Sequence, residues 1–193
     1  MKVRFALCWL IVLVTFVAPL WGSSTVIAQD RRDVRLAETI VRTLNNYTRF
    51  TIFDDVNISV ESGVVTLTGK VTMPYKKDDI GRRVSGIDGV SEVQNRIDVL
   101  PVSTFDDDLR YRIARAIYGN PSFWNYASMA NPPIHIIVER GRVTLTGVVN
   151  SNVERMLARS LATGFGEFEV TNALKTDAEL RDRTQNAELR TKN

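Results

Sequence analysis

His135 is the only histidine of this 193-residue chain, and it is the first side chain to consider for chemistry. An imidazole can transfer protons near neutral pH or bind zinc, but zinc sites usually combine several His, Cys or carboxylate ligands. No such ligand is spaced to join it, since Cys8, the only cysteine, lies near the start of the chain. Strand alternation places His135 opposite Ile134 and Ile136, on the sheet face away from the helices. We therefore expect a packed or surface histidine and no metal site.

Two acidic runs, Asp54-Asp55 and Asp106-Asp107-Asp108, raise the question of cation binding. They lack the glycine and the later glutamate of a calcium loop, and acidic residues are common in loops and at helix starts. The sequence also has no Gly-x-Ser-x-Gly elbow, Walker loop or paired-histidine motif. A carboxylate pair for acid–base catalysis is the remaining enzymatic alternative, but nothing places two carboxylates together. We therefore predict a protein that is not an enzyme and has no catalytic residues, cofactor or metal.

One group of residues in the second half of the chain is suited to a lipid surface. Arginine binds phosphate with two hydrogen bonds, and Trp and Tyr prefer the headgroup level of a bilayer. Each cation near an anionic surface contributes on the order of 1 kcal/mol, so the predicted binding is weak and reversible. In the alternative interpretation, the aromatic side chains fold back over the core and the arginines only keep a helix soluble. The predicted lipid-binding residues are Arg110, Arg112, Arg115, Phe123, Trp124 and Tyr126.

These residues belong to a chain that contains an internal repeat. Residues 63–69 read GVVTLTG, and residues 141–147 read GRVTLTG, so six of the seven positions are identical. A glycine, an alternating run and a second glycine are typical of a strand that leaves a tight turn. Two copies indicate that one folding unit is used twice.

Hydrophobic periodicity predicts the same order of elements in both halves, namely helix, strand, strand, helix and strand. In the first half, Leu36 to Leu44 have helical spacing, and Pro74 opens the second helix. In the second half, Leu109 to Ile117 form the first helix, and Asn150-Ser151 precede the second. The predicted strands cover residues 56–60, 65–71, 93–99, 134–138, 143–149 and 170–174.

The paired motifs resemble the BON domain, which is named for bacterial osmotic-shock and nodulation proteins. The resemblance rests on Val-x-Leu-x-Gly and on a closing Val-x-Asn, both of which occur twice. The structural motif residues are Gly63, Val65, Leu67, Gly69, Val93, Asn95, Gly141, Val143, Leu145, Gly147, Val170 and Asn172. The second unit has Glu167-Phe168 where the first has Gly89-Val90, so we expect that turn to be built differently. The resemblance implies an α+β fold in which each unit packs two helices on one face of a three-stranded mixed sheet. It also implies a non-catalytic role at phospholipid surfaces and in envelope integrity.

The motif residues have structural explanations. Glycine within a strand suits a bend or a close approach of two main chains, where a side chain would not fit. Asparagine is unusual inside a strand, but its carboxamide can tie a neighbouring turn to the sheet. We therefore interpret the glycines and asparagines of the motifs as structural and not as ligand-binding.

Residues 1–28 have the features of a signal peptide, with Lys2 and Arg4 before an apolar stretch and cleavage expected before Gln29. An uncleaved N-terminal anchor is the alternative, although Pro19 interrupts the apolar stretch. The predicted domains are residues 31–100 and 105–175, followed by a charged tail at 176–193 that is frayed or disordered.

The formal net charge is +3, and the leader contributes two of these charges, so a nucleic-acid partner is not indicated. We predict a periplasmic envelope protein that associates with anionic phospholipid and supports envelope integrity or stress tolerance. The alternative is a protein-interaction adaptor in a periplasmic, secretion or transport assembly, which would dock an envelope protein on the outer sheet face or on residues 120–133. The sequence leaves the oligomeric state open.

Overall fold

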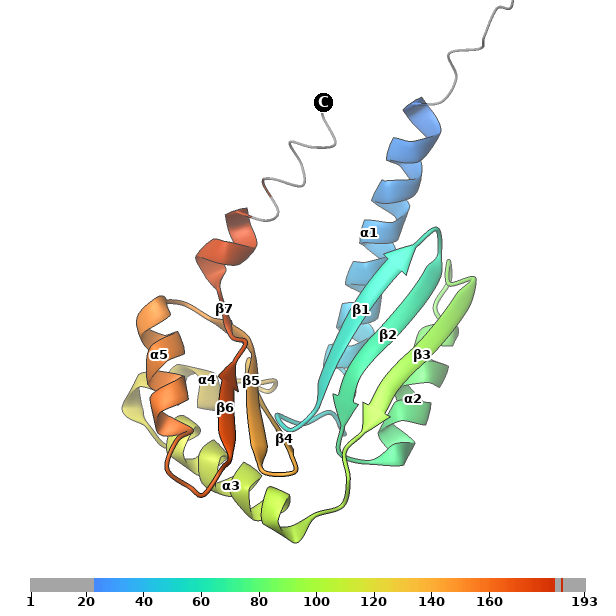
Figure 1. The fold of residues 1–193 in the computed structure, drawn as a ribbon. Helices are drawn as coiled ribbons and strands as arrows, with labels where there is room; N and C mark the ends of the chain where they lie inside the picture. Colours follow the sequence, from blue (N-terminus) through green and yellow to red (C-terminus); the bar gives the residue numbers. More distant parts are fainter. Residues whose placement is uncertain (1–22, 183–184, 186–193) are drawn as a thin grey trace, which may run out of the picture.

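The computed structural model describes residues 23–182 and residue 185. The predicted signal peptide lies outside the described residues up to residue 22, and the same holds for most of the predicted tail. Helix α1 (Ser23–Asn45) begins within the predicted signal peptide. The described chain forms two units of similar plan, each with helices packed on a small sheet (Figure 1).

The first unit has the predicted order of helix, strand, strand, helix and strand. Its two helices cover one face of the sheet (Figure 1). The middle strand pairs antiparallel with the first strand and parallel with the third. Apolar side chains between helices and sheet, among them Ile40, Leu67 and Ile80, are fully buried. After α1, the elements are β1 (Asp55–Glu61), β2 (Val64–Val71), α2 (Pro74–Ser85) and β3 (Glu92–Val99).

The second unit repeats this plan and adds two short helical segments in the longer connection. Its elements are α3 (Thr104–Tyr118), η1 (Pro121–Phe123), α4 (Trp124–Ala127), β4 (Ile134–Glu139), β5 (Arg142–Val149), α5 (Asn152–Leu161), β6 (Glu169–Asn172) and β7 (Lys175–Thr176). The predicted α+β fold with two mixed sheets is therefore confirmed.

The last predicted strand of the second unit differs from the expectation of one continuous element. Both β6 and β7 pair parallel with β5 in one register, so this sheet has four strands instead of three. Thr176 is buried in β7, and its hydroxyl accepts a hydrogen bond from the N–H of Glu179 at 3.3 Å. Residues 177–182 are helical, so the folded chain continues past the predicted boundary at residue 175.

The strand glycines allow two main chains to approach closely. A Cβ atom on Gly69 would lie 2.1 Å from the carbonyl oxygen of Asp55, and one on Gly147 would lie 1.8 Å from that of Pro133. Both glycines also have positive φ angles, of 117° and 109°. Any side chain at either position would therefore force the paired strands apart.

The motif asparagines connect each sheet to its second helix. The side-chain amide of Asn95 donates to the carbonyl oxygen of Lys77 at 2.9 Å, and that of Asn172 donates to the carbonyl oxygen of Arg155 at 2.8 Å. Each carboxamide oxygen also accepts a main-chain N–H two residues further along its strand. These bonds tie the second helix of each unit to the sheet, and not a neighbouring turn as the sequence predicted.

An aspartate on the first helix of each unit holds the hairpin turn between the first two strands. The Asp106 carboxylate accepts the N–H groups of Arg140 and Gly141, both at 2.8 Å. Arg140 has a φ of 52°, which is unusual for a residue other than glycine. Asp33 binds residues 62–63 in the same way. The sequence suggested only a helix-start role for these acids, and the structure adds the bonds to the turn.

Replacing Asp106 by Ala should destabilise the chain by about 2–3 kcal/mol, because two N–H groups beside a buried position lose a charged acceptor. Chemical denaturation followed by circular dichroism measures this difference. Asp108→Ala is the control, since Asp108 is an exposed neighbour that forms an ion pair with Arg112. The control should stay within about 0.5 kcal/mol of wild type. Equal losses in the two variants would contradict this role of Asp106.

Candidate functional site

The six residues predicted for lipid contact do not form one exposed surface. Arg110, Phe123 and Tyr126 are buried, with exposed fractions of 4%, 0% and 5%, so they cannot reach a bilayer in this fold. Arg112, Arg115 and Trp124 are exposed, and Trp124 retains 63% of its surface. The prediction is corrected to these three residues.

Arg110 is buried because it covers the outer edge of β4. Its guanidinium donates to the carbonyl oxygen of Val138 at 2.5 Å and forms an ion pair with Asp107. The Tyr118 hydroxyl, from the same helix, donates to the carbonyl oxygen of Ile134 at 2.5 Å. Two side chains of α3 therefore satisfy main-chain groups that an edge strand would otherwise expose.

Tyr126 is buried because its hydroxyl joins a hydrogen-bonded group at the start of α5. The hydroxyl donates to Glu154 at 2.7 Å and accepts from the N–H of Asn150 at 2.9 Å. Burial and the bond to Glu154 raise the pKa of Tyr126 to about 12, so the phenol stays protonated. Phe123 packs into the core beside it. For Phe123 and Tyr126, the interpretation that the aromatic residues fold back over the core therefore describes the structure.

A buried ion pair occupies the corresponding place in the first unit. Lys76 and Asp54 are almost completely buried, and their charged atoms lie 2.6 Å apart. Asp54 also accepts the N–H and hydroxyl groups of both Thr51 and Thr72. Burial alone would raise the pKa of Asp54, but the bonds from Lys76 and the threonines lower it below its usual value. These bonds connect a loop to the start of α2 and leave the carboxylate no free oxygen for catalysis.

Two exposed phenylalanines meet at the hairpin turn of the second unit. Phe105 is in the first turn of α3 and is 46% exposed, and Phe168 precedes β6 and is 78% exposed. A Cβ atom on Gly141 would lie 2.7 Å from the Phe168 ring and 3.4 Å from the Phe105 ring. The N–H of Phe168 donates to the carbonyl oxygen of Gly141 at 2.9 Å. The start of α3, the β4–β5 turn and the loop before β6 lie at one end of this unit, toward the bottom of Figure 1.

Two arginines flank these rings. Arg140 is exposed, and its side chain has no hydrogen-bonding or ionic partner in the part of the chain that the structure describes. The side chain of Arg142 is 70% exposed, and its Nε forms an ion pair with Oε2 of Glu169 at 3.7 Å. We call Phe105, Phe168, Arg140 and Arg142 the aromatic tip. Ser91 borders the equivalent turn in the first unit, so the tip belongs to the second unit alone.

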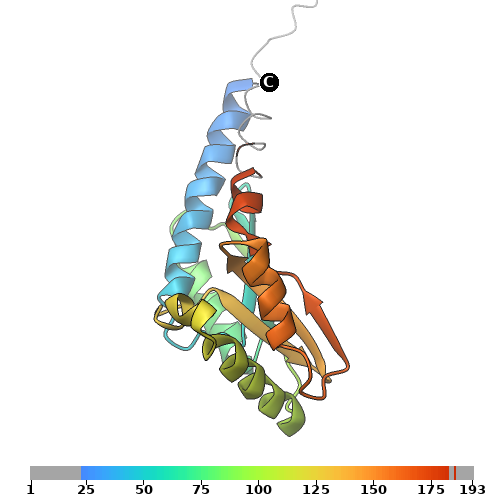
Figure 2. The same cartoon turned by 90° about the vertical axis from the view of Figure 1, so that its left-hand side faces the viewer.

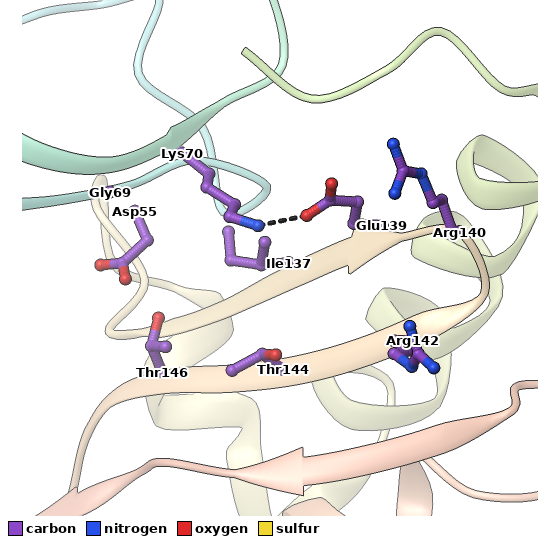
Figure 3. Close-up of a pocket in the computed structure, with 9 residues that line it drawn as sticks. All are labelled: Asp55, Gly69, Lys70, Ile137, Glu139, Arg140, Arg142, Thr144 and Thr146. Carbon is purple, nitrogen blue, oxygen red and sulfur yellow. Dashed lines mark hydrogen bonds and ion pairs between the residues drawn. The ribbon is translucent and has the colours of Figure 1, made fainter. Parts of the chain in front are cut away.

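A cleft of about 380 Å³ between the two units begins beside the aromatic tip (Figure 3). The ion pair between Lys70 and Glu139 crosses it. Its lining residues are Asp55, Gly69, Lys70, Ile137, Glu139, Arg140, Arg142, Thr144 and Thr146. The cleft therefore lies on the outer face of the second sheet, which the first unit partly covers.

His135 lies on the same sheet face, packed against the first unit. Its ring centroid is 5.7 Å from that of Phe50, and burial lowers its pKa below the usual value. Thr146 is its neighbour across the β4–β5 pair, yet the Thr146 hydroxyl and His135 Nδ1 are buried and have no hydrogen-bond partner among the described residues. Because the two do not bond to each other, His135 does not activate this hydroxyl as a nucleophile.

The described residues, 23–182 and 185, contain neither a metal-binding cluster nor a membrane-spanning helix. No three His, Cys, Asp or Glu side chains are grouped there so that they could hold a metal ion. None of the helices in this part has the length and the apolar composition that crossing a bilayer requires.

Comparison with known proteins identifies a family and shows distant similarity to solved structures. The profile of the BON domain matches residues 32–101 and 106–178. No curated protein matches the chain. The chain is similar to CdsD, a structural protein of the type III secretion system of Chlamydia trachomatis, with 12% identity over 78% of this chain and 97% of that chain, and a TM-score of 0.28. It is also similar to the C-terminal domain of CdsD, with 12% identity over 73% of this chain and 96% of that chain, and a TM-score of 0.26. Scores this low carry no argument about function.

Replacing His135 by Gln should reduce the loss of stability on mild acidification. Burial holds the pKa of His135 below its usual value of 6.5, so the unfolded chain binds a proton there before the folded chain does. Wild type should therefore lose stability as the pH falls below about 6.5, and His135→Gln should lose less over the same interval. Urea unfolding at several pH values between about 7 and 5.5 measures both slopes. Parallel stability curves would show that His135 titrates alike in both states.

Proposed function

The chain belongs to the BON domain family, and on this premise we propose that it is a non-catalytic, exported envelope protein that binds anionic phospholipid surfaces through the second unit. BON domains are generally associated with membranes or phospholipids, and the family is generally non-catalytic. The observation that carries the proposal is the aromatic tip, where two exposed phenylalanine rings and two exposed arginines share one turn.

The tip has the chemistry that an interfacial contact needs. Phe168 exposes 78% of its surface, so transfer of its ring to the boundary between headgroups and acyl chains removes apolar area from water. Full burial of a phenylalanine contributes roughly 1.5–3 kcal/mol, and each arginine near an anionic surface contributes about 1 kcal/mol. The sum is a few kcal/mol, which corresponds to weak and reversible association and not to an anchor.

The other exposed residues of the predicted lipid set lie farther along the chain, with Arg112 and Arg115 on α3 and Trp124 on α4. Arg112 is ion-paired with Asp108, which reduces its attraction for phosphate. Arg115 lies in the last turn of α3 and is not part of this ion pair, and Trp124 begins α4. The short helix α4 packs near the end of α3 (Figure 2). The tip combines more exposed apolar surface with two exposed arginines, of which Arg142 is ion-paired with Glu169. Trp124 is tested as a second contact.

The proposed location is the periplasm, after removal of the signal peptide before Gln29. Tethering by an uncleaved N-terminal segment remains the alternative, and the mass of the exported protein distinguishes the two. At either location, the weak lipid contact would support envelope integrity by association with the membrane surface.

Replacing both phenylalanines of the tip by Ser should lower binding to anionic liposomes about tenfold or more, because the apolar part of the contact is lost. Flotation of the mature chain with liposomes of phosphatidylglycerol and phosphatidylcholine measures the bound fraction. Val102→Ser is the control, since Val102 is 97% exposed in the linker between the units. Trp124→Ser tests for a membrane contact at α4.

Two results would contradict this assignment. If wild type floats with neither anionic nor neutral liposomes, the lipid-binding function is wrong. If only Trp124→Ser loses binding, the membrane contact lies at α4 and not at the tip.

Neutralising the two tip arginines should weaken binding about fivefold for each charge removed. Arg140→Gln with Arg142→Gln should also make binding less sensitive to salt, because fewer screened attractions remain. Arg31→Gln with Arg35→Gln, on the exposed side of α1, makes the same charge change in the first unit. Flotation measured at increasing sodium chloride concentrations compares the two double variants. An equal effect of the two pairs would indicate that only net charge matters.

A further inference from the structure

The first strand of the first unit, β1, has an open edge. Glu61 and Val64 pair next to the two-residue turn between β1 and β2. Hydrogen-bonded positions alternate along an antiparallel pair, so the N–H and C=O groups of Val56, Ile58 and Val60 point away from β2. None of these groups has a hydrogen-bond partner among the described residues. A row of unpaired main-chain groups on an edge strand is a template for another strand.

The corresponding edge of the second unit is closed. The N–H of Ile136 donates to the carbonyl oxygen of Ile52 at 2.7 Å, so a turn of the first unit covers β4 at this point. Arg110 and Tyr118 of α3 cover the carbonyl groups on either side. Ala37 and Asn45 occupy the equivalent places on α1, and neither side chain bonds to β1. The same edge is therefore sealed in one unit and open in the other.

An apolar strip accompanies the open edge. Val34 and Val41, on the adjoining side of α1, expose 54% and 45% of their surface. The inward side chains of β1 are only partly buried, whereas those of β4 are completely buried. At the start of β1, a cavity of about 700 Å³ is lined mainly by apolar residues. These include Val41, Phe50, Ile52, Val56, Pro132, Pro133 and Val148, and His135 also lines it.

We propose that the β1 edge binds an extended peptide segment of another protein, which adds to the sheet as a further strand. Unpaired main-chain groups favour a main-chain partner, and at the equivalent edge of the second unit Ile136 has one, the carbonyl oxygen of Ile52. Apolar side chains at alternate positions of the peptide would cover the strip along α1. Because the charged side chains of β1, Asp55 and Glu61, are both acidic, the intervening positions of the peptide should include basic residues.

A peptide fits the surroundings better than a second copy of the chain does. β1 is the strand of its sheet that faces the second unit (Figure 1). A second folded copy approaching this edge would therefore meet the second unit, whereas a single extended segment needs only the width of one strand. The site would make the chain an adaptor in addition to its proposed lipid contact.

The test uses the mature chain without lipid and the peptide Lys-Val-Thr-Ile-Thr-Val-Lys, blocked at both ends. Binding should slow amide hydrogen exchange at Val56, Ile58 and Val60 at least tenfold and leave the amides of β3 unchanged. A peptide with proline at its centre, which lacks an N–H group, should bind at least tenfold more weakly, and so should one with glutamate at both ends.

Protein variants distinguish binding at the β1 edge from binding at other surfaces. Val34→Lys with Val41→Lys should weaken binding of the basic peptide at least tenfold, and both positions are exposed enough to keep the fold intact. Val102→Lys is the matched control and should bind as wild type does. All three proteins should float equally with anionic liposomes, so failure of the peptide site is distinguishable from failure of the lipid site.

Two outcomes would overturn the proposal. The first is peptide binding that leaves the β1 amides unprotected, or no binding at all. The second is protection of these amides that rises with protein concentration in the absence of peptide, which would assign the edge to a second copy of the chain.

Discussion

The second unit depends on one carboxylate, that of Asp106, which accepts two main-chain N–H groups of the hairpin turn. This interaction fixes Arg140 at a positive φ and directs Gly141 toward the start of α3. Because Gly141 has no side chain, the rings of Phe105 and Phe168 can border the turn from both sides. The aromatic tip is therefore a consequence of the turn geometry, and its arginines project from a backbone that is already held.

The two units use the same scaffold and differ in how they satisfy equivalent polar positions. Lys76 and Asp54 form a buried ion pair in the first unit, whereas Glu154 and the Tyr126 hydroxyl take this place in the second. The longer connection of the second unit supplies this tyrosine. The two units therefore share a core plan and differ in the side chains around it. The first unit has an open strand edge, and the second has an exposed aromatic tip.

The sequence predicted the repeat and the order of elements because both follow from local periodicity and turn residues. It did not predict the burial of Arg110, because helical spacing does not reveal that a neighbouring strand edge needs a donor. It also missed the aromatic tip, since Phe105 and Phe168 are far apart in the chain and meet only through the fold. The one available indication was Glu167-Phe168 in place of Gly89-Val90, which marked a different turn without indicating its function.

The tip and the open edge lie on different units, so occupation of one does not block the other in this fold. The β4–β5 turn lies at the bottom of Figure 1, and the end of β1 near Glu61 lies toward the top. Each contact is weak by itself, because a few exposed side chains or one added strand bury little area. If the peptide belongs to a membrane-bound partner, the chain would bind the partner at the β1 edge and the membrane at the tip. The second binding step would then occur at a raised effective concentration. Two weak sites on one chain would in this way select partners that are already at the membrane.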